Sequence, residues 1–82
     1  MRAVLDGAKI FSAEQLYQEL KCRLPLPEWY GNNLDALYDC LTTMEETELV
    51  LVNWPAEGYL QRAAKAMYDA AEENEKIKIT IM

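Results

Sequence analysis

The sequence predicts a two-layer α/β fold: a three-stranded parallel sheet in the order 1-2-3 with helices on one face. Apolar runs of strand length lie at residues 1–6, 49–53 and 77–81. Helical patterns separate these runs, and parallel strands require such crossover connections. Right-handed crossovers then place every helix on the same side. The order 2-1-3, with helices on both faces, stays open as the alternative.

The three predicted strands differ in pattern. The first ends at Asp6-Gly7, a typical turn pair. The run Leu49 to Val52 is uninterrupted, as expected for a central or doubly covered strand. In the last, isoleucines alternate with Lys78 and Thr80, which indicates a strand with one wetter face at an edge of the sheet.

Two predicted helices flank the middle of the chain. The first spans residues 13–23, where Ser12 caps the helix and Gln15 reaches back in a capping box. The last spans residues 56–74. Gly58 weakens its first turn, so the helix either begins near residue 59 or is split there.

A third helix is predicted inside the stretch WYGNNLDALYDCLT, residues 29–42. Asn32 or Asn33 can cap it by accepting a backbone N–H bond. Its apolar residues recur at i, i+3, i+4 and i+7, which places them in one stripe: Leu34, Leu37, Tyr38 and Leu41.

Asp35 and Asp39 lie one turn apart, away from this stripe. Like charges at this spacing destabilise an isolated helix by about 0.2–0.5 kcal/mol. No Lys or Arg occurs between Arg23 and Arg62 to relieve the repulsion. A cation from a partner would do so, whereas the simpler interpretation is a solvated acidic helix face.

The acidity of the chain is concentrated in its middle. The net charge is −6, yet residues 24–61 alone carry −7 because they contain no base. A field of this sign attracts a cationic partner and repels RNA and DNA, so we expect no direct nucleic-acid binding. The seven acids are Glu28, Asp35, Asp39, Glu45, Glu46, Glu48 and Glu57.

The composition favours a non-enzyme without metal or cofactor. The chain has no His, which removes the commonest general base and metal ligand. Cys22 and Cys40 are best interpreted as reduced thiols, Cys40 as a small, partly buried apolar residue. We expect one cytoplasmic domain over residues 1–82, with no signal peptide and no apolar run near the roughly 18 residues that cross a bilayer.

The stretch from Leu26 to Thr42, LPEWYGNNLDALYDCLT, resembles the signature of the barstar family, intracellular inhibitors of secreted bacterial ribonucleases. The resemblance extends over nearly the whole chain and is weak between Trp54 and Glu75. It implies a barstar-like fold and one-to-one binding to a basic, extracellular-type ribonuclease such as barnase. It also implies a role as antitoxin or immunity protein.

The resemblance also assigns the binding residues. Asp39 would enter the phosphate-binding pocket of the enzyme in place of RNA phosphate, with Asp35 assisting from one turn back. Trp29 would stack on the rim of the active site. Surrounding contacts would come from Gly31, Asn33, Leu34, Tyr38 and Thr42.

Two departures from the family pattern bear on the target. Trp29 and Tyr38 stand where the best-known member has Tyr and Trp, which reshapes the rim. The segment before the last helix is shorter, so acidic contacts near its end have only candidates: Glu72, Glu73 and Glu75. The alternative function is an immunity or interaction module of the same fold whose partner is not a ribonuclease.

Overall fold

The computed structural model describes residues 1–26 and 33–82. The chain alternates strands with helices, as the sequence predicts, and one short 3-10 helix follows the first strand. In order the elements are β1 (Arg2–Asp6), η1 (Gly7–Lys9), α1 (Ala13–Arg23), α2 (Leu34–Thr42), β2 (Thr47–Val52), α3 (Tyr59–Glu73) and β3 (Ile77–Ile81).

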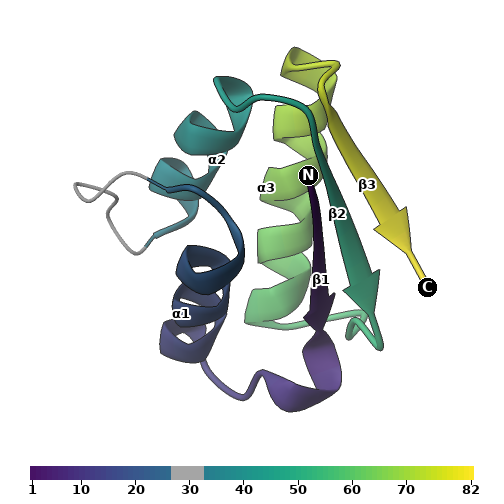
Figure 1. Ribbon diagram of the computed structural model, residues 1–82. Helices are drawn as coiled ribbons and strands as arrows, with labels where there is room; N and C mark the ends of the chain where they lie inside the picture. The colour runs from purple at the N-terminus through teal and green to yellow at the C-terminus, as the bar shows by residue number, and fades with distance from the viewer. Residues whose placement is uncertain (27–32) are drawn as a thin grey trace.

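The sheet is parallel and has the predicted order, with β2 between β1 and β3. Val4 is in register with Val50, and Val50 is in register with Thr80. The helices gather on one side of the sheet (Figure 1). This arrangement confirms the order 1-2-3 and excludes the alternative 2-1-3.

Burial along the strands reflects this one-sided cover. Ala3 and Leu5 of β1 face the helices and are buried, whereas Val4 between them is 41% exposed. Leu49 and Leu51 also face the helices. Val50 points to the open side, yet it is 1% exposed because Val4 and Thr80 flank it in the sheet. The uninterrupted apolar run therefore marks a central strand.

Helix α3 links the sheet to the other helices. It contacts β3, α1 and α2, and its buried face consists of three alanines and a methionine. Small side chains let neighbouring elements approach closely, and Met67 fills the remaining space. The core residues of α3 are Ala63, Ala64, Met67 and Ala70.

One predicted boundary was wrong. β2 begins at Thr47, two residues before the predicted run, because Thr47 and Glu48 pair with β3 despite their polarity. α3 is continuous and begins at Tyr59, which confirms the start near residue 59 and excludes a split at Gly58. Gly58 takes φ +88° at its N-cap, a conformation that glycine adopts without steric cost.

The predicted capping box at α1 is confirmed. Ser12 Oγ accepts a hydrogen bond from the Gln15 N–H at 3.1 Å. The Gln15 side chain reaches back to the N–H of Phe11, one residue before the cap, at 2.7 Å. The first bond satisfies a donor that the first turn of the helix leaves free, and the second ties the residue before the cap to the helix.

Candidate acidic interface on helix α2

Helix α2 is fixed at its start by Asn33. The Asn33 Oδ1 accepts a hydrogen bond from the Ala36 N–H at 2.8 Å, so Asn33 is the N-cap. Leu37, Cys40 and Leu41 are buried, and α2 packs on α3. The capping and this packing together determine which face of the helix meets solvent.

The solvent face of α2 carries both predicted aspartates. Asp35 and Asp39 are exposed, and neither carboxylate forms an ion pair with any residue in the described part of the chain. Asp35 lies in the first turn, where the positive end of the helix dipole favours a carboxylate. Asp39 lies one turn further along and gains little from the dipole.

Neutral hydroxyl groups bond the free backbone carbonyls at the end of α2. The Thr42 hydroxyl donates to the Asp39 carbonyl at 2.8 Å, and the Thr43 hydroxyl lies 3.3 Å from the Cys40 carbonyl. The last turn contains no basic residue. The negative end of the helix dipole therefore adds to the negative potential around Asp39 instead of being neutralised.

Most of the predicted binding residues share this element. Asn33 is its cap, Asp35 and Asp39 are exposed, and Leu34, Tyr38 and Thr42 are half-buried. Trp29 and Gly31, with the rest of the segment 27–32, lie outside the described residues. The six described residues therefore come from one capped helix.

The expectation that the acidic middle segment lacks basic neighbours holds for only some of its residues. Glu45 pairs with Lys76 at 3.2 Å, and Glu48 pairs with Arg2 at 3.4 Å. Both bases are distant in sequence and are brought in by the sheet. Fewer acidic residues of this segment are therefore unpaired than the sequence indicates. The acids on α2 are among those that have no ion-pair partner in the described part of the chain.

Cys40 has the buried position expected for it. Burial raises the pKa of its thiol, and the neighbouring Asp39 carboxylate raises it further. A thiol with a raised pKa is a poor nucleophile and a poor metal ligand. Within residues 1–26 and 33–82, no three His, Cys, Asp or Glu side chains are grouped to hold a metal ion.

Comparison with known proteins identifies the family of this chain. The model of the family described as "Barstar (barnase inhibitor)" matches residues 1–81. The chain belongs to the barstar family. A curated relative, "Putative ribonuclease inhibitor YrdF" of Bacillus subtilis (strain 168), is 43% identical over 51 residues. That match covers 62% of this chain and 56% of the relative, so the chain spans little more than half of the curated protein's length.

In this barstar-family chain, one residue contacts the end of α2 although the sequence does not indicate that contact. Asn74 is the last residue of the predicted helix 56–74, and it occupies the C-cap of α3. Its side chain, however, also bonds the Leu41 and Met44 carbonyls, 33 and 30 residues away. No local sequence pattern signals a contact at that separation.

Among the helices that the structure describes, none has the length and hydrophobicity to span a membrane.

Proposed function

We propose that this protein inhibits a ribonuclease by covering its active site with the acidic face of α2. The observation that carries the proposal is the pair Asp35 and Asp39. Both are exposed on a capped helix without an ion-pair partner among the described residues. Membership of the barstar family and the name of the Bacillus subtilis relative support inhibition of a ribonuclease as the general function.

In the proposed complex, Asp39 stands in for an RNA phosphate. Its carboxylate accepts charge-assisted hydrogen bonds from the cationic side chains that bind substrate, and these are stronger than neutral hydrogen bonds. Asp35 contributes a second negative charge from one turn back. Contact with the enzyme also relieves the repulsion between the two aspartates, which no ion pair with a described residue offsets in the free protein.

The surrounding contacts follow the family resemblance. Trp29 stacks on the rim of the enzyme's active site, since an aromatic anchor beside a charged contact is typical of binding hot spots. The rest of the interface consists of Gly31, Asn33, Leu34, Tyr38 and Thr42. The partner is a basic ribonuclease of the barnase type, bound one to one in the cytoplasm before the enzyme is secreted.

Titration of RNA cleavage tests this proposal. A small basic bacterial ribonuclease of the barnase type would be mixed with increasing amounts of the protein, and cleavage of an RNA substrate followed. We expect cleavage to fall linearly and to stop at one equivalent. Full cleavage in the presence of excess protein would contradict the proposal for this class of enzyme and favour an immunity or interaction module with another partner.

A further inference from the structure

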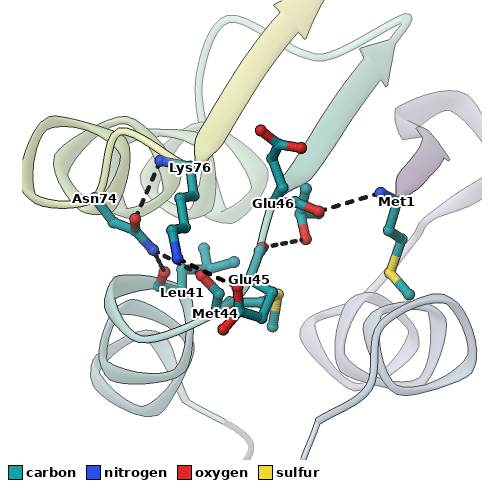
Figure 2. A network of polar contacts seen from close by, with 8 residues as sticks. Met1, Leu41, Met44, Glu45, Glu46, Asn74 and Lys76 are labelled. Atoms are coloured by element: carbon teal, nitrogen blue, oxygen red, sulfur yellow. Dashed lines mark hydrogen bonds and ion pairs between the residues drawn. The ribbon is translucent and has the colours of Figure 1, made fainter.

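The Asn74 side chain joins the end of α3 to the end of α2. Its Nδ2 donates to the Leu41 carbonyl and to the Met44 carbonyl, each at 2.9 Å. Its Oδ1 accepts from the Lys76 N–H at 3.1 Å. Figure 2 shows the amide placed between the two helix ends, with Lys76 reaching Glu45 beside it.

These bonds match the capacity of the amide closely. An Asn side chain has two N–H donors, and both find a backbone carbonyl here, while the oxygen finds a backbone N–H. The partners lie in the last turn of α2, in the loop after it and in the turn before β3. One side chain thus fixes three segments that the sequence separates.

The position of α2 depends on such tertiary contacts. The helix has nine residues, and helices shorter than about 12–15 residues are marginal in water on their own. Asn33 holds its start, and Asn74 holds its end. Leu41, whose carbonyl receives the Asn74 bond, is fully buried and lies two residues after Asp39.

The three Asn74 bonds, which together form a clamp, also leave the charge of the candidate interface unchanged. Helix C-termini are commonly stabilised by Lys or Arg side chains, which bond the free carbonyls and neutralise the dipole. A cation at that position would weaken the negative potential next to Asp39. The neutral Asn74 amide satisfies the same carbonyls without adding positive charge.

We infer that Asn74 is a positioning residue for the acidic face of α2. It holds the last turn of the helix against the α3–β3 turn, and Asp39 thereby keeps the orientation that the partner meets. The role in binding rests on the proposed function, whereas the clamp itself is a property of the free protein. Asn74 is not on α2 and is not among the residues that the proposed function assigns to the interface, so it would be a determinant of binding beyond those residues.

The first test measures amide hydrogen exchange in the free protein. In Asn74→Ala, we expect the amides of Thr43 and Met44 to exchange at least about tenfold faster relative to the amides of α1. In Asn74→Asp, which keeps the shape but sets a carboxylate against two carbonyls, we expect at least the same change. Equal acceleration in α1 and at Thr43 and Met44, or no effect of Asn74→Asp, would overturn the clamp.

The second test measures binding to a barnase-type ribonuclease in a double-mutant cycle. We expect Asn74→Ala to weaken binding about tenfold when Asp39 is present, and less than twofold in an Asp39→Ala background. Thr80→Val is the matched control, since it removes the hydrogen bond to Glu48 on the open face of the sheet, and it should change the Kd less than twofold.

The outcomes separate the two proposals. An equal effect of Asn74→Ala in both backgrounds would overturn positioning through Asp39. Failure of the unmodified protein to bind would overturn the proposed function and with it the role of Asn74 in binding. The exchange measurement would in that case still establish or overturn the clamp.

Discussion

At the residue scale, the candidate interface depends on which charges stay unpaired. Glu45 and Glu48 have bases within ion-pair distance, whereas Asp35 and Asp39 have none among the residues described. Exposed ion pairs are individually weak, at about 0–1 kcal/mol. Their consequence here is electrostatic, because pairing removes those acids from the net field that a partner meets.

The two cysteines should differ in reactivity. Cys22 is exposed, whereas Cys40 is buried beside Asp39 and has a raised thiol pKa. Only the thiolate is alkylated, so at pH 8 we expect iodoacetamide to modify Cys22 first and to leave Cys40 largely intact, as followed by mass spectrometry of peptides. Equal rates in the native protein would contradict the buried position of Cys40.

The raised pKa of Cys40 also predicts the direction in which the free energy of unfolding changes with pH. Above the ordinary thiol value of 9.0, the unfolded chain ionises Cys40 while the folded chain keeps it neutral. The stability that the neutral Cys40 thiol contributes is therefore fully present below that pH. It is lost as the pH rises through the pKa of Cys40 in the folded chain.

Single-residue roles were only partly predictable from the sequence. Ser12 was predictable as a cap, and the cap of α2 was predictable to within Asn32 or Asn33, because a cap bonds a residue only three positions away. The ion pairs of Glu45 and Glu48, and the Asn74 bonds to Leu41 and Met44, span more than 25 residues. They exist because the parallel sheet brings distant turns together, which no local pattern encodes.

At the element scale, α2 is a short helix supported at both ends. Asn33 caps its start, and Thr42, Thr43 and Asn74 satisfy carbonyls at its end. Its buried stripe packs on α3, and this packing leaves the aspartates on the solvent side. A binding face on a supported helix loses little conformational freedom when a partner docks.

The two helix caps offer a matched pair of variants. Asn33→Ala and Ser12→Ala each remove one side-chain bond to the first turn of a helix, and each should lower the free energy of unfolding by about 1 kcal/mol. Urea denaturation measures that change. Only Asn33→Ala should also weaken binding to the ribonuclease, because only α2 carries the proposed interface. Equal losses of affinity would indicate a general effect of stability.

The helix boundaries were easier to predict than the strand boundaries. α1 coincides with its prediction, because a capping box and basic residues mark its two ends. β2 starts earlier than predicted, since Thr47 and Glu48 pair as strand residues despite their polarity. Strand ends depend on neighbouring strands, and a single segment does not contain that information.

At the scale of the whole molecule, the sheet order sets the fold, and the charge distribution affects how the protein associates with a partner. Helical connections and right-handed crossovers predicted a parallel sheet and favoured the order 1-2-3, but only the structure excluded the order 2-1-3. The residues predicted to bind the partner can be placed in the structure only where they lie on α2 or at its N-cap. The part that the resemblance assigns to Trp29 and Gly31 lies outside the described residues and stays a prediction.

The net charge of −6 should affect the rate of association with a basic enzyme. Raising the ionic strength from about 0.01 M to 0.15 M shortens the Debye length from about 30 Å to about 8 Å. We therefore expect the association rate constant in stopped-flow experiments to fall at least about tenfold, with a much smaller change in dissociation. A rate independent of salt would contradict electrostatic steering.

The most direct test of the central claim is calorimetric titration of a barnase-type ribonuclease with the protein and two variants, Asp39→Ala and Glu57→Ala. Glu57 is an exposed acid in the connection between β2 and α3, at the opposite end of β2 from the end of α2. We predict one-to-one binding that Asp39→Ala weakens at least about 30-fold, the level of a hot spot, and that Glu57→Ala changes less than twofold. Equal, small effects of the two substitutions would contradict the proposal that α2 is the binding surface.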